Sequence, residues 1–167
     1  EPDKNMRLNT ALLKTMTGGD TLTARYLNEN SLEFVPRFKL FINTNYLPNT
    51  GNDTSVFASD RMHTIPFERH FSREEQDRTL KETLTSPESL SGILNWCIEG
   101  YRMYLKDGLN PPAAVVAATR EYANASDQIG MFMEENLEKG IEKAIELAEA
   151  YQQYKAWCDL NGFRPEN

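Results

Sequence analysis

The chain has 167 residues, of which 40% are hydrophobic and 26% charged, and its net charge is −7. This composition is typical of one compact globular domain, or one and a fraction, and no apolar run approaches the length of a membrane span. The acidic balance argues against broad electrostatic binding of duplex nucleic acid, although a few basic groups can still be concentrated in a channel.

The cysteines and histidines predict no metal site. Cys97 and Cys158 lie far apart in helix-like segments, so we expect buried free thiols rather than a disulfide or a pair of metal ligands. His63 and His70 also lack ligand spacing to another Cys or His. Free thiols are typical of a cytoplasmic protein, and we expect that location here.

The N-terminal part of the sequence predicts a helix followed by strands. Apolar residues at helical spacing over residues 5–17 end at a Gly-Gly pair. Residues 21–35 are rich in β-formers around a polar turn at 28–30, which predicts a hairpin. Residues 38–43 are apolar on both faces and predict a central third strand. Residues 61–67 predict a fourth strand.

From residue 72 the sequence predicts helices. Ser72 and Glu75 have capping-box spacing, and Ser86-Pro87 is a strong helix start whose helix is expected to end at Gly108. Further helices are expected over 112–122, after a cap at Ser126, and over 141–160. A change of composition near 124–127 suggests a linker between a sheet-containing part, residues 1–124, and a helical tail, residues 125–167.

Three segments in a fixed order carry a resemblance to a known family. They are KTMTGGD with the following hairpin, KLFINTNYLP, and SVFASDRMHTIPFERHF. This order resembles that of superfamily-3 helicases, above all the phage and plasmid primase-helicases, relatives of the poxvirus primase-helicase. The likeness covers nearly the whole chain, and the cluster between residues 14 and 67 is its specific part. The tail LAEAYQQYKAWCDLNGFRP resembles the start of a winged-helix module more weakly.

The resemblance implies an α+β fold. We expect the C-terminal half of an AAA+-type α/β sandwich, with a few-stranded sheet and a β-hairpin, followed by a helical extension. It implies a parent protein that uses ATP to unwind DNA during phage or plasmid replication, as a ring that is expected to be a hexamer. Its implied ligands are ATP, Mg²⁺ and single-stranded DNA, and no membrane is involved.

The resemblance also assigns roles around the nucleotide. Glu1 matches the end of the Walker B strand and is expected to orient the attacking water. Asn45 ends motif C and is expected to act as sensor 1 beside the γ-phosphate, where a neutral amide positions phosphate and water without adding charge. Arg61 matches the arginine finger, which reaches the nucleotide of a neighbouring subunit. Lys14 is a further candidate for a nucleotide contact in trans.

The hairpin is expected to contact DNA. In the family, it lines the central pore and often carries a Lys at its tip, where this chain has Asn28-Glu29-Asn30. An acid at the tip moves the expected contact to Arg25, Tyr26 and Arg37, which can neutralise backbone charge and stack on bases.

The phosphate-binding loop of the family is missing, because no GxxxxGK[ST] motif occurs in the sequence. The family carries this loop before the Walker B strand, and the chain begins at Glu1 without a Met. We therefore expect a fragment of a longer protein. ATP and Mg²⁺ would bind the complete protein, and the isolated fragment would be inactive.

Five of the site residues also have a purely structural interpretation. Asn45 can be a turn-forming residue, Arg61 a surface ion-pair partner, and Lys14 a solvated helix charge. Arg25 and Tyr26 can serve cross-strand pairing within the hairpin.

Two other interpretations of the whole chain remain open. The chain could be a non-catalytic DNA-binding or oligomerisation module derived from this family. It could also be an unrelated α+β protein with coincidental spacing, which the lack of a hairpin at residues 21–35 projecting from the sheet would favour.

Overall fold

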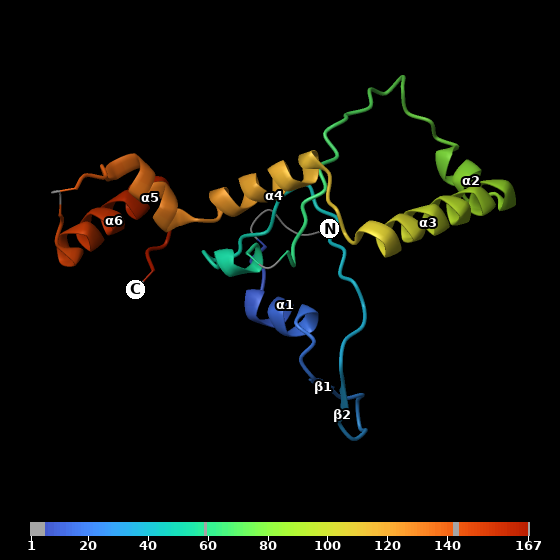
Figure 1. Ribbon diagram of the computed structural model, residues 1–167, viewed down its shortest axis with the longest axis horizontal. Coiled ribbons are helices and arrows are strands. Elements are labelled where there is room, and N and C mark those ends of the chain that lie inside the picture. Colours follow the sequence, from blue (N-terminus) through green and yellow to red (C-terminus); the bar gives the residue numbers. More distant parts are fainter. Residues whose placement is uncertain (1–5, 59, 142–143, 167) are drawn as a thin grey trace. The chain divides into compact units, whose positions relative to one another are not determined.

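The computed structural model describes residues 6–58, 60–141 and 144–166. The chain divides into two compact units, one formed by Glu1–His63 with Thr119–Asn167 and the other by Thr64–Ala118. Helices and a two-stranded sheet make up the described elements (Figure 1), so the mixed α+β composition is confirmed.

The first unit begins with a short helix, α1, over Thr10–Thr17. Asn9 caps it, because its side chain accepts a hydrogen bond from the Leu12 amide at 2.9 Å. The helix ends at Gly18 and is followed by Gly19, whose φ of +84° lies in the left-handed region that glycine tolerates. The predicted Gly-Gly stop is confirmed, but the helix begins at Thr10, five residues later than predicted, because Met6 and Leu8 bond to Asn49 instead.

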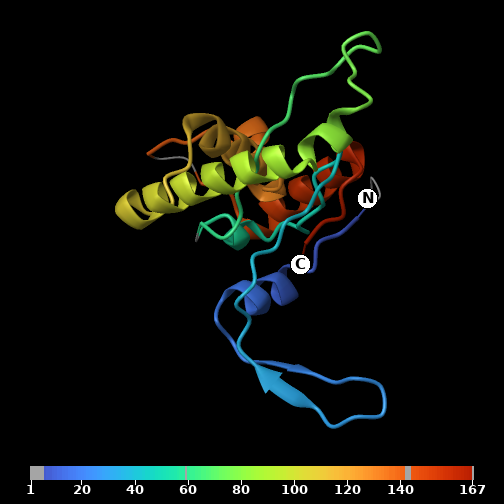
Figure 2. The same ribbon diagram turned by 90° about the vertical axis from the view of Figure 1, so that its right-hand side faces the viewer.

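The predicted hairpin is present. Strand β1, Leu22–Ala24, pairs antiparallel with β2, Leu32–Phe34, in a register that places Leu22 opposite Phe34. Asn28 has a φ of +65° at the turn, a conformation that Asn accepts more readily than most residues. Figures 1 and 2 both show the hairpin extending away from α1, with its turn at the far end. The described residues form no larger sheet from which this hairpin could project.

The third and fourth strands are not formed, and these two predictions are wrong. Residues 38–43 and 61–67 form no strand in the structure. The apolar side chains of the first segment are exposed, and that of Phe41 is 82% exposed. A strand needs a neighbouring strand to accept its backbone hydrogen bonds. Within the described residues, the only strand pair is the hairpin itself.

A loop over residues 48–57 is held against two helices of the first unit. Next to α1, an isolated parallel bridge joins Arg7 and Asn49. The short 3-10 helix η1, Thr54–Val56, follows, and Val56 is fully buried. On the other side lies the C-terminal part of α4, Ala113–Ala125. Its Tyr122 donates a hydrogen bond to the Pro48 carbonyl, and burial raises the pKa of Tyr122 to about 12.

Helices α5, Gln128–Asn136, and α6, Leu147–Asn161, pack on each other around an aromatic cluster. The buried members are Phe132, Tyr154, Trp157 and Cys158. The cap of α5 is Asp127 rather than the predicted Ser126. Helix α6 begins six residues later than predicted and ends at Gly162, whose φ of +72° gives the expected left-handed stop.

The second unit contains α2, Leu80–Leu84, and α3, Pro87–Asp107. Ser86 caps α3 and Gly108 ends it, as predicted. Its Cys97 is exposed, so the prediction of a buried thiol holds only for Cys158. None of the described helices combines the length and the apolar character needed to cross a membrane.

Candidate functional site

The C-terminal turns of α1 and the loop around Asp53 carry the charged cluster of the first unit. The Nζ atom of Lys14 lies 2.6 Å from Oδ2 of Asp53, and both side chains are about one-third exposed. The other carboxylate oxygen of Asp53 accepts hydrogen bonds from the amide and hydroxyl of Ser55, at 3.2 and 2.6 Å. This geometry fixes the Lys14 ammonium beside the loop over residues 48–57.

The pKa of Asp53 lies well below its ordinary value. The largest cause of this lowered pKa is the hydrogen bond from Lys14, followed by the hydrogen bonds from the hydroxyls of Ser55 and Thr10. Each of these donors favours the ionised carboxylate, so Asp53 stays negatively charged across the whole physiological pH range.

We expect Asp53→Asn to lower the free energy of unfolding by about 1 kcal/mol at pH 7, because the pair is partly exposed and screened by solvent. The pKa of Asp53 is lower in the folded state than in the unfolded state, where it is about 3.9. The ionised carboxylate therefore stabilises the fold fully above the unfolded-state pKa, and this stabilisation is lost as the pH falls through the folded-state pKa. The difference between wild type and Asp53→Asn should therefore shrink below about pH 4. Urea unfolding of both proteins at pH 7 and pH 3 measures this difference in the free energy of unfolding.

The control for this prediction is Glu121→Gln, which changes an exposed carboxylate on α4. It should leave the stability at pH 7 nearly unchanged. A difference between wild type and Asp53→Asn that is the same at both pH values would contradict the assigned role of the ionised carboxylate.

Arg61 lies at the same end of α1. Its Nη1 donates a hydrogen bond to the carbonyl oxygen of Lys14 at 3.3 Å. That carbonyl belongs to the last turn of the helix, where C=O groups lack intrahelical partners and a cation is favoured by the helix dipole. The structure thus brings the predicted residues Lys14 and Arg61 together, through a contact that stabilises the helix end.

Asn45 lies in a turn of the exposed segment after residue 43. The Thr44 hydroxyl donates to the carbonyl of Tyr46 at 2.6 Å and accepts from the Tyr46 amide at 3.1 Å. These bonds fix a tight turn with Asn45 at its centre, and the Asn45 side chain is exposed. The predicted position at the end of a strand is not observed, because residues 38–43 are unpaired. The role of Asn45 as a sensor stays a prediction.

The predicted DNA-contact residues belong to the projecting hairpin and the segment after it. Arg25 follows β1 directly, Tyr26 is 69% exposed, and Arg37 is also exposed. Leu27 beside them is 90% exposed. The hairpin therefore presents basic, aromatic and aliphatic side chains to solvent at the same place.

Glu1 lies outside the described residues, and its assigned role stays a prediction. Across residues 6–58, 60–141 and 144–166, no group of His, Cys, Asp or Glu side chains has the geometry to hold a metal ion.

Sequence reasoning missed Asp53, which lies 39 residues after its partner Lys14. The only local signal was the sequence Asn52-Asp53-Thr54-Ser55, in which an Asp two residues before a Ser is a common capping pattern. That pattern indicates the cap of η1 but not the distant lysine.

Two viral proteins show sequence similarity to almost the whole chain. One is named "Putative helicase L207/L206", from Acanthamoeba polyphaga mimivirus, and the other "Putative helicase 022R", from Frog virus 3. Each is 29% identical over an alignment that is 180 residues long and covers 96% of this chain. The chain is therefore related to proteins that are named as viral helicases.

The chain spans 18% of the length of each of these relatives. No protein-family model and no solved structure matches it.

Proposed function

We propose that the chain is the C-terminal part of the ATPase domain of a superfamily-3 DNA helicase, followed by the start of a winged-helix module. The observation that carries this proposal is the similarity to two viral proteins named as helicases across 96% of the chain. The order of the motifs between residues 14 and 67 supports the superfamily, because the resemblance noted above rests on that order. The complete protein would act in replication of a phage, plasmid or related mobile element.

In this proposal, ATP and Mg²⁺ bind between neighbouring subunits of a ring, which we take to be a hexamer. Glu1 and Asn45 act on the nucleotide of their own subunit, as water-orienting acid and sensor. Arg61 acts on the nucleotide of the neighbouring subunit, where a guanidinium stabilises the charge that develops during phosphoryl transfer. The ion pair of Lys14 with Asp53 and the bond from Arg61 to the Lys14 carbonyl support a shared location for these two cations.

The DNA contact in this proposal is the exposed hairpin. Single-stranded nucleic acid is bound by basic groups that follow the backbone and by aromatic rings that stack on bases. Arg25 and Tyr26 provide one group of each kind on the flank of the hairpin, and Arg37 adds a second cation after β2.

The test of the proposed function is an assay of ATP hydrolysis and strand separation with the complete protein that carries this chain. We expect DNA-stimulated hydrolysis and unwinding from the complete protein. The 167-residue chain alone should stay at background, because the amides, lysine and hydroxyl of a phosphate-binding loop are needed for hydrolysis. A complete protein that binds DNA without hydrolysing ATP would instead indicate a non-catalytic binding or oligomerisation module.

We expect Arg25→Ala to weaken binding of single-stranded DNA by the complete protein and to lower the salt slope. Loss of one phosphate contact changes the slope by about 0.7 for a single strand. Titration of a labelled oligonucleotide across a salt series measures this change.

Glu29→Ala is the matched control at the hairpin turn, and it should leave binding unchanged or slightly tighter because it removes a negative charge. Basal ATP hydrolysis without DNA should survive both changes. If Arg25→Ala binds like wild type at every salt concentration, the hairpin is a structural or subunit-contact element.

A further inference from the structure

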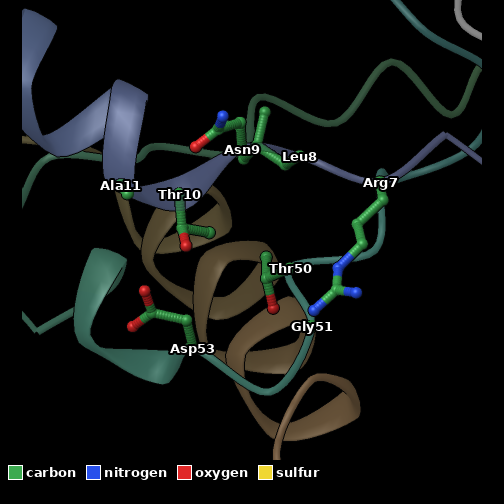
Figure 3. Close-up of a pocket in the computed structure, with 8 residues that line it drawn as sticks. All are labelled: Arg7, Leu8, Asn9, Thr10, Ala11, Thr50, Gly51 and Asp53. Atoms are coloured by element: carbon green, nitrogen blue, oxygen red, sulfur yellow. The ribbon is translucent and has the colours of Figure 1, made fainter.

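A polar pocket lies at the N-terminal end of α1, beside the loop that carries Asp53. Its volume is about 380 Å³, and its polar lining includes Arg7, Thr10, Thr50 and Asp53. Figure 3 shows Arg7 reaching toward Gly51 and Thr50 from one side, with Thr10 and Asp53 on the other. The backbone hydrogen bonds from Leu8 to Asn49 and from Asn49 to Met6, at 2.8 and 2.9 Å, hold the two walls together.

The pocket presents several hydrogen-bond donors and one unpaired cation. The first intrahelical bond of α1 runs from the Leu13 amide to the Asn9 carbonyl, so the amides of Thr10 and Ala11 precede it and carry the positive end of the helix dipole. Within the part of the chain that the structure describes, the guanidinium of Arg7 forms no hydrogen bond or ion pair.

Gly51 allows Arg7 to occupy this place. A Cβ atom at Gly51 would collide with the guanidinium of Arg7, and the φ of +63° also favours glycine there.

Thr50 gives an independent indication that the pocket accepts a polar group. Its side chain is 3% exposed, and its hydroxyl oxygen has no hydrogen-bond partner within the described residues. Figure 3 shows this hydroxyl on the pocket side, facing the guanidinium of Arg7. Buried hydroxyl groups in folded proteins are nearly always paired with protein, water or a ligand, so an unpaired one in a pocket wall is available to bond a polar group that enters the pocket.

The charge balance favours an anion even though Asp53 belongs to the same lining. The carboxylate of Asp53 is already engaged by Lys14 and Ser55. Counting Arg7, Lys14 and Asp53 together leaves one positive charge, to which the helix dipole adds. An anion that contacts Arg7 and the two amides would therefore meet a net attractive field.

We propose that this pocket binds a phosphate group, either free or as the terminal phosphate of a nucleotide. The exposed Arg7 side chain would first move aside to admit the phosphate and would then pair with two of its oxygens. The Thr10 and Ala11 amides would donate hydrogen bonds to the phosphate, and the Thr50 hydroxyl would bond to it as well. Such a group has the charge and the several acceptor oxygens that this set of donors needs. The proposal stands apart from ATP hydrolysis, since it concerns binding alone.

The test is a titration of the 167-residue chain with inorganic phosphate, with ATP and with adenosine, followed through the amide resonances of Thr10 and Ala11. We expect shifts with phosphate or ATP and none with adenosine. Arg7→Gln should weaken binding by about tenfold or more, since it removes a charge-assisted, two-pronged contact. Tighter binding of ATP than of inorganic phosphate would show that the phosphate group bound in this pocket belongs to a nucleotide.

The variants at Thr50 separate a ligand contact from a packing effect. Thr50→Val removes the hydroxyl at nearly constant shape and should weaken binding several-fold, while Thr50→Ser should retain it. Arg73→Gln is the control, because it removes an exposed arginine of the other unit. The proposal is overturned if neither phosphate nor ATP shifts these amides, or if Arg7→Gln binds as wild type does. Arg7 is exposed, so its variant remains informative even if the Thr50 variants fail to fold.

Discussion

Arg61→Ala in the complete protein is expected to abolish ATP hydrolysis while nucleotide affinity stays within a few-fold of wild type. An arginine finger acts on the transition state, and its contribution to the rate is about 10³–10⁵ in related phosphoryl-transfer systems. Steady-state hydrolysis and binding of a labelled nucleotide measure the two quantities separately.

The control for this prediction comes from the second contact of Arg61. Its bond to the Lys14 carbonyl stabilises the end of α1, so Arg61→Ala is also expected to lower stability by about 0.3–1 kcal/mol. Arg61→Lys keeps a cation near that helix end but loses the planar guanidinium group that can make two parallel hydrogen bonds. Hydrolysis should therefore be lost in both variants, whereas stability should fall mainly in Arg61→Ala. If Arg61→Lys restores most of the rate, the bidentate contact with phosphate is the wrong explanation.

The assignment of Arg61 to a neighbouring subunit has its own test. Mixing Arg61→Ala with Asn45→Ala should restore part of the activity, because some interfaces of a mixed ring then combine a wild-type Arg61 with a wild-type Asn45. Rings that stay inactive despite demonstrated co-assembly would show that the two residues do not act across an interface.

The features that sequence reasoning predicted well are those set by nearby residues. The Gly18-Gly19 stop, the Ser86-Pro87 start and the Gly162 stop each depend on one backbone conformation or one capping bond. The hairpin is equally local, since its turn and register are fixed within residues 21–35.

The capping hydrogen bond at Ser72 forms, but no helix begins there. The amide of Ser72 donates to Glu75 at 2.9 Å, as the capping box predicts, but α2 begins only at Leu80. A cap satisfies the first amides of a helix and cannot supply the packing that stabilises its following turns. The predicted helix start at Ser72 is therefore wrong, although its local hydrogen bond is right.

The features that sequence reasoning missed depend on partners far along the chain. Residues 38–43 have the composition of a central strand, but composition does not provide the neighbouring strands that would pair with it. Likewise, Lys14 and Asp53 meet across 39 residues, and nothing in the sequence near either residue specifies the other. The roles of Glu1 and Asn45 depend on a bound nucleotide and stay predictions.

The largest effect on stability is expected from Trp157→Ala in the aromatic cluster of α5 and α6. Trp157 is 7% exposed, and its ring centroid lies 6.0 Å from that of Phe132 and 5.4 Å from that of Phe163. Its Nε1 also donates to Glu135 at 2.7 Å. Truncation leaves a cavity and removes this hydrogen bond, so we expect a loss of about 3–5 kcal/mol.

The matched control is Trp96→Ala, because Trp96 is 77% exposed on α3. Its removal should change stability by no more than about 0.5 kcal/mol. Urea unfolding followed by circular dichroism gives the global free energy, and amide hydrogen exchange shows whether α5 and α6 lose protection first. Because these two helices share one small core, α6 should lose protection in Trp157→Ala even where the hairpin keeps its own. Equal effects of the two substitutions would show that the aromatic cluster does not hold α5 and α6 together.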